Sequence, residues 1–169
     1  MIASTDRRAG LCGSDQDGGR HDRFHKIAAE PPGYGAGMGI SEEAAALYAN
    51  DPSAETFGIE LLDAGPEGST VRMTIQPGMC NGLGIVHGGM VFLLADSAMA
   101  FTSNSGPMPA VATTAEIDWV APARAGQVLT ATATRRWSGK RSALWDVTIT
   151  ADDTTVALFR GRTRQVATT

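Results

Sequence analysis

The chain has 169 residues, which suits a single domain, and 43% of them are hydrophobic, enough to form a packed core. Its formal net charge of −4 at pH 7 argues against a nucleic-acid partner. No apolar run approaches the roughly 20 residues that span a bilayer, so no membrane contact is expected.

The location of the protein is inferred from its first residues and its cysteines. Residues 1–13 lack the apolar segment of a secretory signal. Cys12 and Cys80 lie in unrelated contexts, which favours free thiols in a reducing compartment over a disulfide framework. We therefore expect a soluble, cytoplasmic protein.

Residues 1–39 are expected to form a mobile tail ahead of one folded domain over residues 40–169. The tail is rich in Gly, Asp, Arg and Pro and has no apolar period, so it cannot bury enough surface to offset its chain entropy. His21 and His25 are spaced as two metal ligands can be, but no further ligand accompanies them. No metal site is therefore expected.

The domain is expected to begin with a short helix and a hairpin. Ser41 can cap a helix that runs to residue 49, and Pro52 is expected to stop it. Two strands of alternating polarity follow, with a Gly-Pro-Glu-Gly turn between them, and they cover residues 57–62 and 70–76. A glycine-rich loop then leads directly into an apolar helix over residues 88–103.

The chain after this helix has the pattern of strands alone. The four expected strands cover residues 110–120, 127–137, 142–150 and 154–164. One long apolar helix among six mostly antiparallel strands predicts an α+β fold in which a sheet wraps around a central helix. The helix is apolar nearly all round and a single sheet covers only part of it, so a partner subunit is expected to complete the layer.

The glycine-rich loop and the one acid of the long helix, Asp96, indicate a catalytic site. A buried carboxylate costs several kcal/mol unless it is paired or used, and amides at a helix start are natural partners for a developing negative charge. The pattern Asn81…His87-Gly88-Gly89…Asp96 resembles that of the hotdog-fold acyl-CoA thioesterases, most closely the branch that acts in phenylacetate degradation. Later segments fit too, and the resemblance covers about residues 44 to 166; these segments are Ile117-Asp118-Trp119, Gly139-Lys140 and Val156–Gly161.

The resemblance implies a hotdog fold, an antiparallel sheet wrapped around one long central helix, and catalysis without metal or cofactor, coenzyme A being part of the substrate. It implies homodimers, usually paired into homotetramers. By position, Asp96 matches the catalytic carboxylate, and Gly88 matches the glycine whose N–H holds the thioester oxygen. Asn81 matches the polar side chain near the attacking water or carboxylate. His87 matches the histidine that shapes the carbonyl site.

Substrate-binding residues are assigned less directly. Gly89 belongs to the same loop, and Thr113 or Thr114 can supply the hydroxyl that often joins the site from the strand after the helix. Arg136 and Lys140 flank a turn and are suited to the phosphates of coenzyme A, for which Arg and Lys are common ligands. A solvated hairpin end is the alternative interpretation of these two cations.

The helical rise separates the two halves of this site. Gly88 and Asp96 are eight residues apart, about 12 Å along one helix, which is too far for both to touch one thioester carbon. We therefore expect two composite sites per dimer, each with Asp96 of one subunit and Gly88 of the other. The sequence leaves open whether Asp96 activates a water as general base or attacks the carbonyl as nucleophile.

Three functions fit the pattern. The first is a thioesterase for aryl-acetyl-CoA, such as phenylacetyl- or hydroxyphenylacetyl-CoA, or for medium-chain acyl-CoA. The second is a hotdog-fold dehydratase or hydratase that acts on an acyl thioester through a histidine and an acid. The third is a non-catalytic acyl-CoA-binding protein in which Asp96 is structural. The surrounding residues favour the thioesterase.

Overall fold

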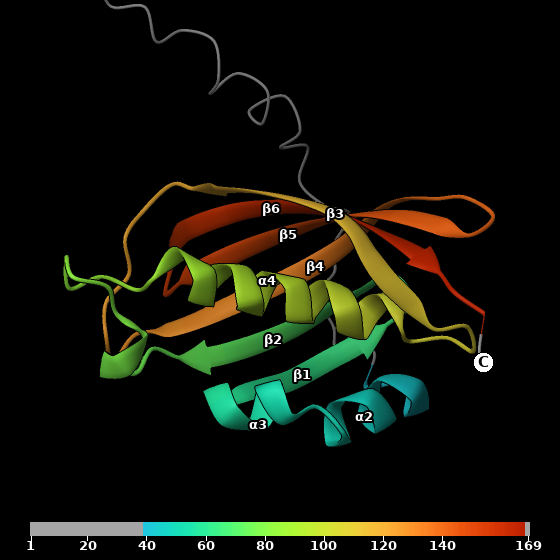
Figure 1. Ribbon diagram of the computed structural model, residues 1–169, viewed down its shortest axis with the longest axis horizontal. Coiled ribbons are helices and arrows are strands. Elements are labelled where there is room, and N and C mark those ends of the chain that lie inside the picture. Colours follow the sequence, from blue (N-terminus) through green and yellow to red (C-terminus); the bar gives the residue numbers. More distant parts are fainter. Residues whose placement is uncertain (1–38, 168–169) are drawn as a thin grey trace, which may run out of the picture. The chain divides into compact units, whose positions relative to one another are not determined.

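The computed structural model describes residues 39–167, so the tail expected over residues 1–39 lies, apart from Gly39, outside the described residues. One six-stranded antiparallel sheet, in the order β1-β2-β4-β5-β6-β3, carries a long helix, α4, across one face (Figure 1). This is the α+β hotdog architecture that the sequence predicts. In chain order the elements are α2 (Glu42–Ala49), α3 (Pro52–Phe57), β1 (Ile59–Gly65), β2 (Gly68–Thr74), the 3-10 helix η1 (Pro77–Met79), α4 (Gly88–Ser103), β3 (Ala110–Trp119), β4 (Val128–Ser138), β5 (Ser142–Ala151) and β6 (Thr154–Gln165).

The predicted helix starts are confirmed. The Ser41 hydroxyl accepts a hydrogen bond from the Ala44 amide at 3.2 Å and caps α2. Helix α4 covers Gly88–Ser103, the range expected from the sequence. All four strands after it lie within a residue or so of their predicted bounds, because turn residues separate them clearly.

Helix α3 was not predicted, because Pro52 was interpreted as a stop. Instead Pro52 is the first residue of α3, where a missing N–H costs nothing. The Asp51 carboxylate caps this helix by accepting hydrogen bonds from the amides of Ser53 and Ala54, at 2.9 and 3.2 Å. Gly58 ends it in a left-handed conformation (φ 64°). The first strand therefore begins after Gly58, and Phe57, predicted to start that strand, is helical.

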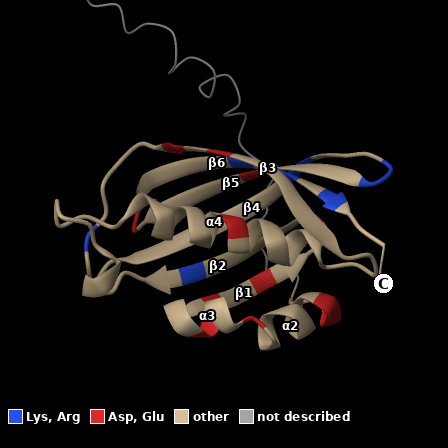
Figure 2. Ribbon diagram, viewed as in Figure 1, with Lys and Arg blue, Asp and Glu red and all other residues tan. Residues whose placement is uncertain are grey.

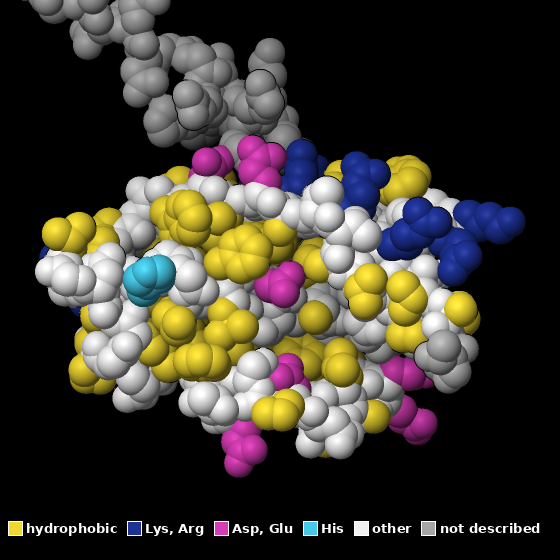
Figure 3. Space-filling view, in the orientation of Figure 1, with side chains coloured by type: hydrophobic (Ala, Val, Ile, Leu, Met, Phe, Trp, Pro, Cys, Tyr) yellow, Lys and Arg dark blue, Asp and Glu magenta, His cyan; other side chains and the backbone are white. Residues whose placement is uncertain are grey.

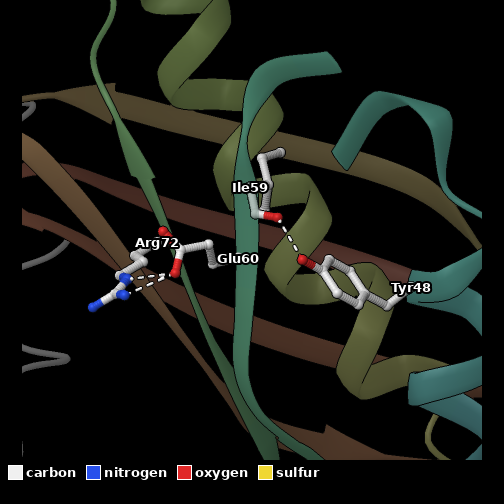
Figure 4. A network of polar contacts seen from close by, with 4 residues as sticks. All are labelled: Tyr48, Ile59, Glu60 and Arg72. Carbon is white, nitrogen blue, oxygen red and sulfur yellow. Dashed lines mark hydrogen bonds and ion pairs between the residues drawn. The ribbon is translucent and has the colours of Figure 1, made fainter. Parts of the chain in front are cut away.

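Helix α2 is held against the start of β1 and against α4 (Figure 4). The Tyr48 hydroxyl donates to the carbonyl oxygen of Ile59 at 3.0 Å, and the Tyr48 ring meets the Phe101 ring edge-on, with centroids 5.7 Å apart. On the next residue of β1, Glu60 forms a cross-strand ion pair with Arg72 of β2 at 2.7 Å. The Tyr48 contacts tie α2 to the β1 end of the sheet.

Helix α4 buries one side against the sheet and leaves the other only partly covered. The buried side is mostly apolar and includes Val91, Leu94, Ala95, Ala98, Met99 and Phe101. The opposite side carries Gly89, Leu93, Asp96 and Ala100, which share a face through their helical spacing and are exposed or half-buried. The expectation that one sheet covers only part of the helix is therefore confirmed.

Strand β3 lies at the edge of the sheet. It pairs with β6 on one side alone, and none of its ten residues is buried. Val111 and Trp119 on this strand are 50% and 55% exposed. A long edge strand with exposed apolar side chains is an unusual feature of a monomer, since it offers free backbone groups to another chain. No helix among residues 39–167 is long and apolar enough to cross a bilayer.

Candidate active site

The glycine-rich loop before α4 is a closed turn. The Asn81 side-chain oxygen accepts from the Leu83 amide at 2.9 Å, and the Asn81 backbone oxygen accepts from the Gly84 amide at 2.9 Å. Gly84 adopts a φ of 72°, which favours glycine. The loop closes where the Asn81 amide donates to the Ile85 backbone oxygen at 2.8 Å. The Asn81 carboxamide oxygen is thus engaged in shaping the turn, while its NH2 group has no partner among the described residues.

His87 is the N-cap of α4. Its Nδ1 accepts a hydrogen bond from the Gly89 amide at 2.9 Å, so the proton of the neutral ring is on Nε2. The side chain is exposed, and Nε2 is therefore available as a donor at the surface. A side chain on Gly89 would place a Cβ 3.1 Å from Nδ1, so the lack of a Cβ at Gly89 lets the histidine cap closely. His87 therefore shapes the start of α4 by capping it, and its role at a carbonyl site stays a prediction.

Gly88 carries the one unpaired amide in the first turn of α4. The Gly89 amide is capped by His87, and the amides of Met90 and Val91 donate to the His87 carbonyl oxygen at 2.8 and 3.5 Å. Among residues 39–167, no acceptor pairs with the Gly88 N–H. Because first-turn amides point out of the helix and carry the positive end of its dipole, this N–H can receive a developing oxyanion.

Trp119 packs on Gly88, a contact that sequence reasoning missed. Its indole N–H donates to the Gly88 carbonyl oxygen at 3.2 Å, and a Cβ at Gly88 would lie 3.0 Å from the indole ring. An aromatic residue at the end of a strand carries no sign of its partner in the sequence. The end of β3 and the start of α4 meet only in the folded chain.

Asp96 lies at the middle of α4, where Figure 2 shows the single acidic residue of that helix. It is half-buried, and burial raises the pKa of its carboxyl group above the ordinary aspartate value. Within the described part of the chain, no cation or hydrogen-bond donor pairs with this carboxylate. Its position on the incompletely covered side of α4 presents it to whatever lies against that side.

The continuous helix confirms the geometric premise of a divided site. Since α4 runs unbroken from Gly88 to Ser103, Gly88 and Asp96 remain about 12 Å apart along the axis. Gly89 and Asp96 are seven residues apart and lie on one stripe of the helix. Hydrophobic side chains cover much of the face between the histidine and the basic end of the molecule (Figure 3).

Thr113 and Thr114 lie at a bulge near the middle of β3. Asn104 contacts Ala110 at one end of α4, and Trp119 contacts Gly88 at the other, so the middle of β3 runs at the level of Asp96. The Thr113 hydroxyl donates to the Arg162 backbone oxygen at 3.1 Å.

The side of the sheet to which Thr114 belongs follows from its neighbours. Thr114 pairs with Arg162 of β6, so the two side chains are on the same face of the sheet. Gly161, the neighbour of Arg162 in β6, belongs to the opposite face. Gly161 faces α4, because a Cβ there would collide with the Met99 side chain. Thr114 therefore lies on the side away from α4.

Arg136 and Lys140 lie at the other end of α4, near the β4–β5 turn, and are not brought to Gly88 within one chain. Arg136 forms an ion pair with Asp146 at 3.1 Å, a carboxylate that also binds Arg160 at 2.6 Å. Lys140 is exposed and has no partner among residues 39–167. Lys and Arg side chains gather at this end of the molecule (Figure 3).

A cavity of about 180 Å³ lies beside this basic end. It separates the end of α4 from the β4–β5 turn, and its lining includes Ser103, Ser105, Arg135, Arg141 and Ser142. Arg135 is ion-paired with Glu67, whereas the Arg141 guanidinium donates to the Gln165 backbone oxygen at 3.2 Å. Among residues 39–167, no three His, Cys, Asp or Glu side chains are grouped as metal ligands. His21 and His25 lie outside the described residues.

Comparison with known proteins adds independent information. The sequence profile of the Thioesterase superfamily matches residues 83–158. The acyl-coenzyme A thioesterase PaaI of Escherichia coli (strain K12) is 40% identical over 129 residues, which cover 76% of this chain and 92% of that protein. The acyl-coenzyme A thioesterase 13 of Mus musculus is 30% identical over 106 residues, 62% of this chain and 76% of that protein.

Solved structures give the same result. The E. coli PaaI protein from the phenylacetic acid degradation operon superimposes with a TM-score of 0.71 at 41% identity, and the match covers 75% of this chain and 93% of that chain. A mutant of the phenylacetic acid degradation protein PaaI from Thermus thermophilus superimposes with a TM-score of 0.66 at 32% identity, over 69% of this chain and 100% of that chain.

Proposed function

This chain belongs to the thioesterase superfamily and is an acyl-CoA thioesterase similar to PaaI, and from that premise we propose that it hydrolyses aryl-acetyl-CoA, such as phenylacetyl- or hydroxyphenylacetyl-CoA, or medium-chain acyl-CoA. The observation that carries the proposal is the Gly88 N–H, the one amide of a capped first turn that has no partner among residues 39–167, together with an Asp96 carboxylate on the same helix that also has none there. A thioester carbonyl needs such a donor as its oxygen gains charge.

The proposed reaction adds water across the thioester bond. The carbonyl oxygen of the substrate accepts a hydrogen bond from Gly88, which stabilises the tetrahedral intermediate. On the general-base route Asp96 removes a proton from the attacking water, and collapse of the tetrahedral intermediate breaks the C–S bond and gives the free acid. On the nucleophilic route the Asp96 carboxylate attacks the carbonyl, the C–S bond breaks to leave a mixed anhydride, and water then hydrolyses this anhydride to the free acid. On both routes the thiolate leaves and is protonated as coenzyme A. No cofactor takes part, since coenzyme A belongs to the substrate.

The site is proposed to form between two subunits of a homodimer. Two α4 helices packed antiparallel along their incompletely covered sides bring Asp96 of one chain to Gly88 of the other. The exposed edge of β3 supports this arrangement, because its free backbone groups and its apolar side chain Val111 offer a surface to a partner chain. Pairing of dimers into a homotetramer is part of the same proposal.

The coenzyme A part of the substrate is proposed to extend toward Lys140 and Arg136. In the antiparallel dimer the reacting carbonyl lies near Asp96, and α4 of that same chain ends seven residues later, about 10 Å away. The β4–β5 turn beyond it carries the unpaired ammonium group of Lys140, suited to a phosphate. Gly89 and Thr113 are proposed to contact the substrate nearer the thioester, whereas Thr114 faces away from α4 and is not part of this proposal. The cytoplasm is the proposed location.

The test is thiol release from a panel of acyl-CoA substrates that includes phenylacetyl-CoA and medium-chain acyl-CoA. Asp96→Asn is expected to reduce kcat by a hundredfold or more, in line with roughly 10²–10⁴ for a lost general base, while Asp153→Asn in an exposed turn serves as the matched control. Hydration of an enoyl-CoA without thiol release would establish the dehydratase or hydratase instead. Tight acyl-CoA binding without turnover of any substrate would establish the binding protein.

The divided site has its own test. In a homodimer of Asp96→Asn subunits both sites lack the carboxylate, and in a homodimer of Gly88→Pro subunits both sites lack the N–H donor. A heterodimer of the two variants contains one site with both groups intact. Mixed, refolded and purified heterodimers are expected to recover up to half of the wild-type activity per dimer. Verified heterodimers as inactive as the two parents would rule out a site shared between subunits.

A further inference from the structure

We propose that Trp119 is a positioning residue that holds the Gly88 N–H in the direction the reaction needs, and this inference rests on the proposed thioester hydrolysis. The indole makes two contacts with one residue: a hydrogen bond to the Gly88 carbonyl oxygen at 3.2 Å and ring contact with its Cα side. The first fixes the peptide plane that follows Gly88, and the second limits rotation about its backbone.

The start of α4 needs such an anchor, because few other groups hold Gly88. His87 precedes it as an exposed cap, and the loop before it is joined to the rest of the domain by a few backbone hydrogen bonds, including Val86 to Ala123 at 2.8 Å. Gly88 has no side chain with which to pack. Trp119 supplies the missing contact from a different element, since β3 is joined to β6 through the pair Trp119–Ala157.

The contact also gives a second reason for glycine at position 88. Close approach of a substrate carbonyl is one reason for the lack of a side chain. The other is the indole itself, because a Cβ at Gly88 would meet the ring at 3.0 Å, tighter than ordinary van der Waals contact. Glycine and tryptophan therefore form a matched pair across α4 and β3.

The energetic effect of this anchor is expected in the chemical step more than in folding. The Trp119 side chain is 55% exposed, so its removal takes little apolar surface out of the core. A donor displaced from the oxyanion by about 1 Å, however, costs roughly a hundredfold in rate. A positioning role thus predicts a lower kcat with an almost unchanged melting temperature.

The experiment compares three variants by kcat, KM, thermal melting and mass in solution. Trp119→Phe keeps a ring and loses the N–H donor, Trp119→Leu loses both, and Trp137→Phe is the matched control. Trp137 is similarly exposed, at 51%, and packs on Gly139 far from Gly88. We expect kcat to fall about tenfold in Trp119→Phe and about a hundredfold in Trp119→Leu, with KM within about threefold of wild type. The control is expected to keep wild-type kcat.

Several outcomes would overturn the inference while leaving the hydrolysis itself established by the wild-type enzyme. One is an unchanged kcat in folded Trp119→Leu protein. A second is a change confined to KM, which would make Trp119 a substrate-binding residue. A third is a kcat that returns to the wild-type value when the protein concentration is raised enough to restore the dimer, which would assign the loss to subunit dissociation.

Discussion

The two ends of α4 differ in whether their terminal backbone groups are hydrogen-bonded. At the last turn, Asn104 closes the helix: its side-chain NH2 donates to the carbonyl oxygens of Ala100 and Ala110 at 2.9 and 3.0 Å, and its oxygen accepts from the Ala110 amide at 2.9 Å. The Ser105 hydroxyl donates to the Phe101 oxygen at 2.8 Å. At the first turn, three amides are satisfied and the Gly88 amide is left open.

This difference separates stability from function within one helix. A buried or half-buried helix end normally satisfies its backbone groups, and at the Asn104 end the carbonyl oxygens of Ala100, Phe101 and Thr102 are paired. The Gly88 end departs from that rule at the Gly88 N–H. This group lies beside the hydrogen-bonded glycine-rich loop and against the indole ring of Trp119. A backbone group that folding leaves unpaired, in a place otherwise hydrogen-bonded, is available to the substrate.

The largest expected effect comes from removal of the Gly88 N–H. Gly88→Pro deletes this donor at the first helical position, where proline is well tolerated, and the extended backbone of His87 suits a following proline. We expect kcat to fall by roughly 10²–10³, the usual cost of one lost oxyanion donor. Steady-state kinetics with the most active acyl-CoA measures it.

Gly88→Ala is the matched control for this variant. It places a Cβ against Trp119 in the same way but keeps the N–H. The ratio of the two kcat values therefore isolates the donor from the steric contact. Equal kcat values in the alanine and proline variants would show that the N–H does not act in the reaction, and the contrast between the two ends of α4 would lose its functional meaning.

The second prediction concerns pH. In the proposed reaction Asp96 acts as a carboxylate, and burial raises its pKa, so kcat should fall about tenfold per pH unit on the acid side, with a midpoint above the ordinary aspartate value. The pH profile of kcat, measured where circular dichroism shows folded protein, checks this. A midpoint at or below the ordinary value would contradict the partial burial of Asp96 in the working enzyme.

The raised pKa of Asp96 also affects stability, in the direction opposite to its effect on kcat: a rise in pH increases kcat but makes the fold less stable. A carboxyl group whose pKa is raised on folding favours the neutral form, so its stabilising contribution is present below the unfolded-state pKa and is lost as the pH rises through the folded-state pKa. At pH 7 the charged Asp96 therefore destabilises the fold. Asp96→Asn is expected to raise the melting temperature by about a few degrees at pH 7, and this gain should shrink as the pH approaches 3.8.

The third prediction tests the closed end of α4. Asn104→Ala removes four side-chain hydrogen bonds and leaves backbone partners at a half-buried helix end unsatisfied. We expect the free energy of unfolding to fall by about 1–3 kcal/mol, with kcat per folded molecule close to wild type, as measured by denaturant titration beside kinetics. A large loss of kcat at unchanged stability would contradict the view that the Asn104 end of α4 serves stability and the Gly88 end serves the reaction.

The smallest expected effect is at the basic turn. Lys140→Ala removes one exposed charge, and exposed charge pairs contribute up to about 1 kcal/mol, so KM for acyl-CoA should rise by at most about fivefold with kcat unchanged. The effect should disappear with an acyl-pantetheine substrate, which lacks the nucleotide phosphates, and should weaken in high salt. Arg141→Ala, at the same turn, provides a comparison for an arginine that already donates to Gln165.

Most of the secondary structure follows from local sequence patterns, because hydrophobic period and turn residues act over short stretches of chain. The spacing of apolar residues and the glycine and proline signals around them placed α4 and the strands from β3 to β6. It also placed the glycine-rich loop and Asp96, because a polar loop and one acid in an apolar helix are visible in one dimension. Helix α3 was missed because Pro52 can either end a helix or begin one, and the Asp51 cap decides which.

Which polar groups are hydrogen-bonded and which are free becomes visible in the folded chain alone. It shows the Asn81 oxygen and His87 Nδ1 bonded to the backbone, Arg136 paired with Asp146, and the Gly88 amide open. It also brings Trp119 onto Gly88 from the far end of β3. The contact of Trp119 with Gly88 joins residues 31 positions apart, and its existence depends on how β3 lies against α4, which no local pattern encodes.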